Sequence, residues 1–378
     1  MDLAGIPIVD GHCHPFLRDP WAVSADAFLD LFSEARPGTM RLHVQHTGYF
    51  QHAIESLARE LGTSATVDAV LARRRALGPK SAREIVSRSA LSALLVDTGY
   101  PADGAMSLGE MRGLVPCAIH EIFRIETCAE RLIREARSFE EFLERFRAEL
   151  ERAAAACAGF KSIIAYRSGL QVHPWPEAEV ASAYRSIVIR VQRGGSARLT
   201  DKALLDTLFF IALDVCVTHG RPLQIHAGFG DPDIDLLQAN PLLLKPILED
   251  PRWSALRLVV LHMAYPYFRE AAFMTAVWPQ VHLDLSLALP FLGPAAVPPL
   301  VEILGLAPAS KLLYGSDVSA IPELFALSAD WGRQSLGEAL DWVVARGRLS
   351  PARAQETARM ILSENAERLY ALGTRARP

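Results

Sequence analysis

Two histidines one residue apart, His12 and His14, are the first side chains in the chain that could do metal chemistry. They follow the apolar run 6–10, which has the character of a buried strand, and Gly11 would let the backbone turn at its end. Side chains at positions i and i+2 project from the same side of an extended segment. Two converging imidazoles would supply a divalent ion with its first two ligands. The alternative is a loop with two solvated histidines.

Three polar residues also end apolar runs later in the chain. If these runs are strands of a barrel, their carboxyl ends form the face that carries catalytic groups. Neutral imidazoles together with one carboxylate suit Zn²⁺ and similar first-row ions. The three residues are His226 after 222–225, His262 after 256–261, and Asp317 after 311–316.

Eight short apolar runs, each followed by helical sequence, would position these side chains. Such apolar strands are covered on both faces, as in a parallel sheet. The pattern predicts an α/β fold, a distorted (β/α)8 TIM barrel with a helical insertion after the first strand and helices at its C-terminal end. An open doubly wound sheet is the alternative, but no Gly-x-Gly-x-x-Gly follows the first strand. The runs are 6–10, 91–97, 113–119, 160–166, 222–226, 256–262, 280–285 and 311–317.

The eight strand–helix units predict one barrel domain over residues 1–378. Residues 20–90 are too many for an ordinary strand-to-helix connection and are expected to form a helical insertion, or lid, above the first strand. Ser24 is expected to cap the first helix of this insertion, and Gly220 to end a helix over 201–219. Other helices are expected over 51–61, 66–76, 128–158, 177–193, 234–249, 266–277, 296–305 and 351–372.

Composition narrows the class of protein. Half of the residues are apolar, 22% are charged and the formal net charge is −4, which argues against a nucleic-acid partner. The five cysteines are widely spaced, so neither a disulfide framework nor a thiolate zinc site is expected. Neither a signal peptide nor an apolar run of 18 residues is apparent. We expect a cytoplasmic protein that acts on a small molecule without a membrane partner; a homo-oligomer is left open.

The sequence resembles the amidohydrolase superfamily over its whole length. The resemblance rests on Asp-Gly-His-Cys-His at 10–14, Gln-Ile-His at 224–226, Leu-His at 261–262 and Tyr-Gly-Ser-Asp at 314–317. It implies that one divalent metal, Zn²⁺ with Mn²⁺ and Fe²⁺ as alternatives, is bound by four residues. It also implies that His262 either binds metal or contacts the bond that breaks. The four implied ligands are His12, His14, His226 and Asp317.

The sequence at 223–231 and 239–241 resembles one branch of this superfamily in particular, the amidohydrolase-related domain that is fused to glutamine-synthetase-like domains in some proteins. That resemblance suggests a γ-glutamyl or similar amino-acid-derived amide as substrate. Many superfamily members hold two metals with a carboxylated lysine at the end of the fourth strand. Here Lys161 lies near the start of the expected strand 160–166, roughly 16 Å from its end at about 3.3 Å per residue. We therefore expect Lys161 to be structural and the site to hold one metal.

Charged residues at the ends of the third and fourth strands are candidates for substrate binding. Arg124, Glu126 and Arg167 follow these strands, and a guanidinium binds a carboxylate through two parallel hydrogen bonds. The alternative is that these residues form structural ion pairs. Asp97 ends the second strand and is expected to be a turn or cap residue.

The leading hypothesis is a metal-dependent hydrolase that cleaves a C–N bond of a small, carboxylate-bearing amide. Asp317 would move the proton between water and the leaving group, and His262 would steady the carbonyl. A metal-dependent non-oxidative decarboxylase of the same superfamily is the first alternative. A catalytically silent barrel that serves as a binding module is the second.

Overall fold

The computed structural model describes residues 1–101 and 104–373. Within them, eight strands are hydrogen-bonded in chain order, and the pairings given for neighbouring strands are parallel. This is the strand arrangement of a (β/α)8 barrel, so the fold class expected from the sequence is confirmed. The strands are β1 (Ile8–Cys13), β2 (Leu91–Asp97), β3 (Ala118–Arg124), β4 (Gly159–Ser162), β5 (Leu223–Ile225), β6 (Leu258–Val260), β7 (Val281–Asp284) and β8 (Leu312–Leu313).

Contacts along the chain gather in two compact units. Unit 1 is made of Met1–His120, Gly230–Pro232 and Asp284–Pro378, and unit 2 of Glu121–Phe229 and Asp233–Leu283. Strands β1, β2 and β8 belong to unit 1, and β4, β5 and β6 belong to unit 2. The single domain expected from the sequence stays a prediction.

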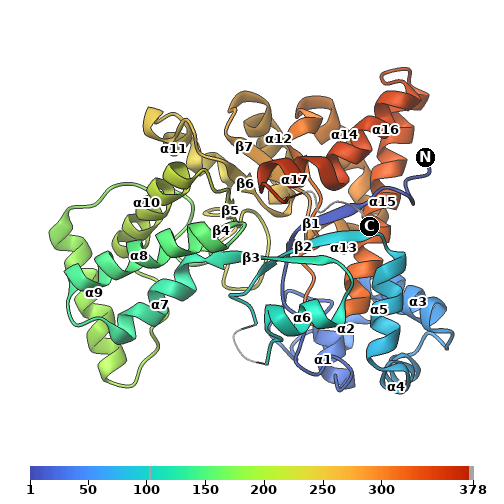
Figure 1. Ribbon diagram of the computed structural model, residues 1–378, viewed down its shortest axis with the longest axis horizontal. Helices are drawn as coiled ribbons and strands as arrows, with labels where there is room; N and C mark the ends of the chain where they lie inside the picture. The colour runs from blue at the N-terminus through green and yellow to red at the C-terminus, as the bar shows by residue number, and fades with distance from the viewer. Residues whose placement is uncertain (102–103, 374–378) are drawn as a thin grey trace. The chain divides into compact units, whose positions relative to one another are not determined.

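Five helices of unit 1 lie between β1 and β2, in the stretch where the sequence predicts a helical insertion (blue in Figure 1). Ser24 caps the first of them, as predicted, because its hydroxyl accepts a hydrogen bond from the N–H of Ala27 at 3.2 Å. Thr47 caps α3 in the same way through the N–H of Phe50. The helices are α1 (Ala25–Asp30), α2 (Arg41–Val44), α3 (Gly48–Leu61), α4 (Val67–Leu77) and α5 (Pro79–Arg88).

The longest helix described, α15 (Pro322–Ala345), follows β8 in unit 1 and was not predicted. Its residues are buried at most positions, so it lacks the polar face that makes a helix visible in sequence. It contacts α3, α5 and α14. The other helices of unit 1 are α6 (Leu108–Leu114), α13 (Ala288–Leu292), η5 (Gly293–Ala296), α14 (Val297–Leu306), η6 (Ala309–Lys311), α16 (Pro351–Arg359), the π-helical η7 (Met360–Glu364) and α17 (Asn365–Leu369).

Residues Ala288–Leu306 are, within the described chain, the segment long and apolar enough to cross a membrane by length and composition alone. The segment is not one regular helix, because α13 ends at Leu292 and Gly293 has a positive φ of 52°. About a third of it (33%) is buried. Core helices of soluble proteins pass the same test, so the absence of a membrane partner stays a prediction.

Four helices of unit 2, α7 to α10, pack against one another, and Figure 1 shows them together in green. The predictions for 177–193 and 201–219 are confirmed, and Gly220 ends α10 with a positive φ of 60°. The stretch 128–158 is two helices, because Ser138 starts a new one. Unit 2 contains α7 (Ile125–Glu135), α8 (Phe139–Ala156), η1 (Ile164–Tyr166), α9 (Glu177–Gln192), α10 (Lys202–His219), η2 (Pro241–Leu244), α11 (Lys245–Leu248), η3 (Pro251–Trp253), η4 (His262–Ala264) and α12 (Phe268–Val277).

The third strand lies later in the chain than predicted. The apolar residues from Gly113 were expected to form it, but Gly113 and Leu114 belong to α6. Ser107 and Glu110 start α6 with a reciprocal capping box, which fixes that segment as a helix. Strand β3 then begins at Ala118.

Candidate metal centre

The end of β1 in unit 1 is held against the loop that follows β8. The N–H of Gly11 donates to the carbonyl of Tyr314 at 2.9 Å, and the N–H of His14 donates to that of Val318 at 2.9 Å. A Cβ on Gly11 would lie 2.9 Å from the Tyr314 oxygen, so this approach requires glycine. The strand continues through Cys13 with an irregular register after Asp10, rather than ending at Asp10 as predicted.

Asp317 lies directly beside the two histidines. Its carboxylate Oδ1 is 3.0 Å from Nε2 of His12 and 3.2 Å from Nε2 of His14. Ligand atoms that surround one ion at about 2.1 Å are themselves roughly 3.0 to 3.4 Å apart. Both imidazole nitrogens therefore lie at the distance from this carboxylate oxygen that is expected of ligands to a single transition-metal ion.

The backbone at Asp317 is fixed in an uncommon conformation. Its φ is +60°, which costs a residue other than glycine about 1 kcal/mol or more. The N–H of Asp317 donates to the carbonyl of His12 at 2.8 Å, which holds that conformation. The uncommon backbone conformation thus belongs to the residue whose carboxylate faces both imidazoles.

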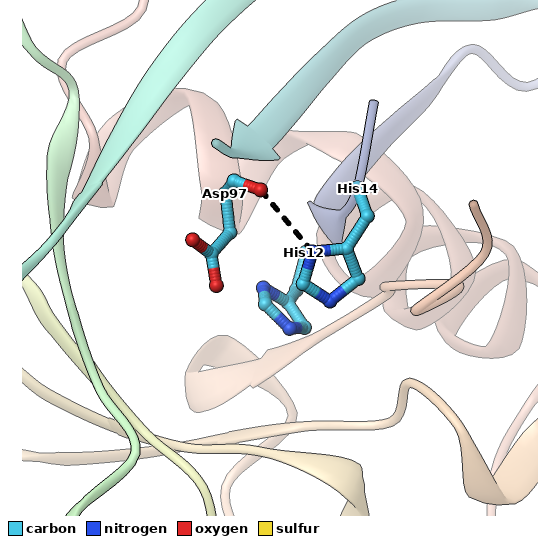
Figure 2. A group of neighbouring side chains, drawn as sticks. All are labelled: His12, His14 and Asp97. Carbon is cyan, nitrogen blue, oxygen red and sulfur yellow. Dashed lines mark hydrogen bonds between the residues drawn. The ribbon is translucent and has the colours of Figure 1, made fainter. Parts of the chain in front are cut away.

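A hydrogen bond from the end of β2 fixes the tautomer of His14. Nδ1 of His14 lies 3.1 Å from the backbone carbonyl of Asp97, as the dashed line in Figure 2 shows. A carbonyl only accepts, so Nδ1 carries the proton and Nε2 carries the lone pair. This arrangement orients a histidine toward a metal.

The side chain of Asp97 belongs to the same group. One ligand atom each from His12, His14 and Asp97 lie within 4.8 Å of one another, and all three residues are buried (Figure 2). The predicted turn role is confirmed, because Oδ1 of Asp97 accepts from the N–H of Gly99 at 3.0 Å. The metal-ligating potential was missed. The signal in the sequence is that Asp97 ends an apolar run, as His226, His262 and Asp317 do.

Asp10 holds the loop that carries Asp317 through hydrogen bonds to Ser316. It is fully buried, and its carboxylate accepts from the backbone N–H of Ser316 at 2.9 Å and from its hydroxyl at 2.6 Å. Burial raises the pKa of Asp10 from 3.8 to about 7, against the lowering effect of the bonds from Ser316. These bonds anchor the residue immediately before Asp317.

The segment around Gly315 is closely packed. A Cβ on Gly315 would collide with Oδ2 of Asp284, the last residue of β7. Asp284 is itself buried and accepts from the backbone N–H of Ser286 at 2.9 Å. The loop that carries Asp317 therefore has little freedom to move away from His12.

Glu34, which follows α1 in the insertion, is a further acid of unit 1 that sequence reasoning did not single out. Burial, together with the negative charges of Asp317 and Asp231, raises the pKa of Glu34 to about 8. The insertion thus brings a carboxyl group within electrostatic range of Asp317.

In unit 2 the structure brings His226 and His262 together. Both are buried, and their ring centroids are 4.5 Å apart. The N–H of His226 donates to the carbonyl of Ser162 at 3.1 Å, which ties the end of β5 to the end of β4. His262 has a positive φ of 65°. The ring of Tyr166 is also close to that of His226, with ring centroids 4.2 Å apart.

Glu126 makes structural bonds at the start of α7. Its Oε1 accepts from the hydroxyl of Ser162 at 2.7 Å and from the N–H of Ile163 at 3.0 Å, and the side chain is buried. Burial raises the pKa of Glu126. Arg124 is the last residue of β3. Nη2 of Arg167 lies 3.4 Å from Oε1 of Glu130. A substrate-binding role for Arg124, Glu126 and Arg167 stays a prediction.

The prediction for the fourth strand is wrong. It was placed at 160–166, but β4 ends at Ser162 and the chain then turns into η1. The apolar residues Ile163 to Ala165 resemble a strand in sequence. The backbone N–H groups of residues 167–169, however, all donate to the carbonyl of Ile164, which makes a turn. Lys161 is therefore one residue from the end of β4, beside Arg124 and Gln224. The expected separation between Lys161 and the end of the strand, on which the prediction of a single metal rested, is therefore wrong. The number of metals stays a prediction.

A family model for amidohydrolases matches residues 123–372. The chain belongs to the amidohydrolase family. It is also similar to an inferred metal-dependent hydrolase from Lactobacillus casei, with 29% identity, a TM-score of 0.87, and 100% of this chain and 98% of that chain covered. The superfamily resemblance of the sequence is thereby confirmed.

Two further proteins are similar to this chain. Protein fluG from Emericella nidulans is 34% identical over 244 residues, which are 62% of this chain and 28% of that protein. This chain therefore spans little more than a quarter of the length of that relative. Uronate isomerase from Thermotoga maritima has a TM-score of 0.69 at 11% identity, with 97% of this chain and 95% of that chain covered. At this identity the likeness shows the fold alone.

Proposed function

We propose that this amidohydrolase is a metal-dependent hydrolase that cleaves the C–N bond of a small, carboxylate-bearing amide. One observation carries the proposal: Nε2 of His12 and of His14 lie 3.0 and 3.2 Å from Oδ1 of Asp317, at the separation of ligands to one ion. The tautomer of His14 also supports the proposal. Because Nδ1 carries the proton, Nε2 is left with the lone pair that a metal needs.

The family resemblance adds His226 as the fourth ligand of the proposed metal. Zn²⁺ suits this set of three imidazoles and one carboxylate, and Mn²⁺ and Fe²⁺ suit it as alternatives. When bound, such an ion lowers the pKa of water and polarises a carbonyl group. The residues that would hold it are His12, His14, His226 and Asp317.

The side chains of the protein would do the proton transfer and the positioning. The Asp317 carboxylate accepts a proton from the attacking water, whose oxygen bonds to the amide carbon. The C–N bond then breaks, and Asp317 returns the proton to the leaving nitrogen. His262 donates a hydrogen bond to the carbonyl oxygen, where negative charge develops. Arg124, Glu126 and Arg167 remain the proposed substrate-binding residues.

Metal content tests the ligand assignment. We expect the wild type to retain metal through gel filtration, and His12→Ala, His226→Ala and Asp317→Ala to lose it while keeping the circular-dichroism spectrum of the fold. Elemental analysis of each purified protein gives the ratio. Stoichiometric metal in the Asp317→Ala variant would remove that residue from the set.

The products test the reaction. The metal-loaded enzyme is incubated with a panel of amino-acid-derived amides in water enriched in ¹⁸O, and products are read by mass spectrometry. Hydrolysis places one ¹⁸O in the carboxylate product and releases an amine. Release of carbon dioxide from a carboxylic acid substrate, with no ¹⁸O in the remaining product, would identify the decarboxylase alternative instead.

A further inference from the structure

Arg167, in the turn after η1 of unit 2, is a largely buried arginine whose hydrogen bonds are incomplete. Its side chain is 11% exposed, and its one ion pair in the described part of the chain joins Nη2 to Oε1 of Glu130 at 3.4 Å. Within the described residues, Nε and Nη1 of Arg167 are buried without a hydrogen-bond partner. Buried donors of a charged group are costly to leave unpaired, and native structures rarely do so without a reason.

The next residue has the same property. The hydroxyl of Ser168 is also buried without a partner among the described residues. The backbone around both side chains is fully engaged, because the N–H groups of Arg167, Ser168 and Gly169 all donate to the carbonyl of Ile164 at 2.9 to 3.1 Å. A fixed turn thus presents two adjacent side chains with three buried polar atoms, Nε and Nη1 of Arg167 and Oγ of Ser168, that have no partner among the described residues.

The charges near this turn indicate what would bind there. Burial lowers the pKa of Arg167, as expected of a cation that is poorly compensated. Glu130 compensates it only in part, because Oε1 of Glu130 also accepts from the N–H of Leu199 at 2.9 Å. Glu126 adds a second negative charge within electrostatic range, and Arg198 and Arg124 add two positive charges. A ligand group with one negative charge fits this balance better than a dianion.

We infer that Arg167 and Ser168 form a subsite for a single carboxylate group of the ligand. The inference rests on the proposed function for its biological meaning, since it names the part of the substrate that lies away from the bond that breaks. Of the three predicted substrate-binding residues, it assigns the carboxylate to Arg167, with Ser168 as a new partner. Oε1 of Glu126 is engaged by Ser162 and Ile163, whereas its Oε2 is buried without a partner among the described residues.

Arg147 on α8 provides a matched control for a change at Arg167. It also has one carboxylate at 3.4 Å, from Asp214, but its side chain is 45% exposed and so has water for its other donors. Loss of positive charge from unit 2 is the same in Arg147→Met and Arg167→Met. Only Arg167→Met removes buried donors that lack a partner.

The test is isothermal titration of the full chain, both metal-loaded and metal-stripped, with acetate, glutaramate, hippurate and inorganic phosphate. We expect at least one carboxylate to bind the metal-stripped protein, Arg167→Met to weaken it about 10- to 100-fold, and Ser168→Ala about 3- to 10-fold. Arg147→Met should bind as the wild type does. If Arg167→Met does not fold, Arg167→Lys, which keeps the charge without the planar fork, should still weaken binding.

Three results would overturn the subsite: no carboxylate binds, binding is unchanged in the Arg167 and Ser168 variants, or phosphate binds more tightly than every carboxylate. None of these depends on catalysis. Amide hydrolysis with an unchanged KM in Arg167→Met would leave the proposed function standing without the subsite. Carboxylate binding through Arg167 in a protein that hydrolyses no amide would leave the subsite standing alone.

Discussion

One backbone oxygen, that of Asp97, determines which nitrogen of His14 faces Asp317. Because it accepts the proton of Nδ1 at 3.1 Å, the imidazole is oriented before any ion arrives. The carboxylate of the same residue stands close to both histidines and also accepts from Gly99. One residue thus serves the turn through one interaction and the candidate metal centre through two.

The two roles of Asp97 can be separated with Asp97→Asn. Asparagine keeps an oxygen for the N–H of Gly99 but removes the negative charge. We expect metal affinity to fall about 10- to 100-fold with little change in the stability of the metal-free protein. Competition with a chromogenic chelator measures the affinity. Unchanged affinity would restrict Asp97 to the turn.

The buried carboxyl of Asp10 should make stability depend on pH. Its folded pKa of about 7 lies above the ordinary 3.8, so between these values the folded state holds a proton that the unfolded state has lost. Stability from this group is therefore full below about pH 4 and is lost as pH rises toward 7. At 1.36 kcal/mol per pH unit the loss is on the order of 4 kcal/mol.

Asp10→Asn, which cannot ionise, measures that effect in the metal-free protein. Urea unfolding at pH 5 and pH 8 should show the variant gaining stability relative to the wild type as pH rises. A constant difference between the two proteins across this range would mean that Asp10 is ionised in the fold at pH 5.

At the scale of elements, one buried ion pair joins the insertion to the helix after β8. Nε of Arg74 on α4 lies 2.9 Å from Oε1 of Glu323 on α15, and both side chains are fully buried. Nη2 of Arg74 also donates to the carbonyl of Pro20 at 2.9 Å. Pro20 and Glu323 each follow a candidate metal ligand by six residues, so Arg74 connects the two segments that leave the metal centre.

Removal of one partner should be far more damaging than removal of both. Arg74→Met leaves Glu323 buried and uncompensated, and we expect a loss of about 3 to 5 kcal/mol in the free energy of unfolding. The double variant Arg74→Met with Glu323→Leu should recover most of it. Urea unfolding of the two single variants and the double variant measures the coupling; additive losses would show that the two residues act independently.

Some elements could be predicted from sequence because local signals define them. Ser24 and Gly220 mark helix ends by their own chemistry, and α9 and α10 were found near their true ends. The predicted fourth strand was too long, because Ile163 to Ala165 are apolar and such residues occur in a buried turn as well as in a strand. Helix α15 was missed because burial on nearly all sides removes its periodicity.

The candidate site was predictable in its residue types and less so in its surroundings. His12, His14 and Asp317 end apolar runs, and the structure brings them together. The unpaired donors of Arg167 and Ser168 depend on a turn whose geometry comes from packing, so no spacing in the sequence reveals them.

At the scale of the whole molecule, a bound metal should add to global stability. A ligand that binds only the folded state at 100 times its Kd adds about 2.7 kcal/mol. We therefore expect chelation to lower the Tm of the wild type by several degrees and to leave the Tm of His226→Ala unchanged. Calorimetry with and without a chelator measures both; a wild-type Tm that chelation does not move would argue against a metal in the folded protein.

The bonds that join β1 to the loop after β8 also set when the centre can form in the cell. Asp10 and Ser316, which anchor it, are 306 positions apart in the chain. At about 5 to 20 residues per second, a ribosome needs roughly 15 to 60 seconds to make the residues between them. During that time His12 and His14 exist without Asp317, so the three residues can hold an ion together only after the ribosome has passed residue 317.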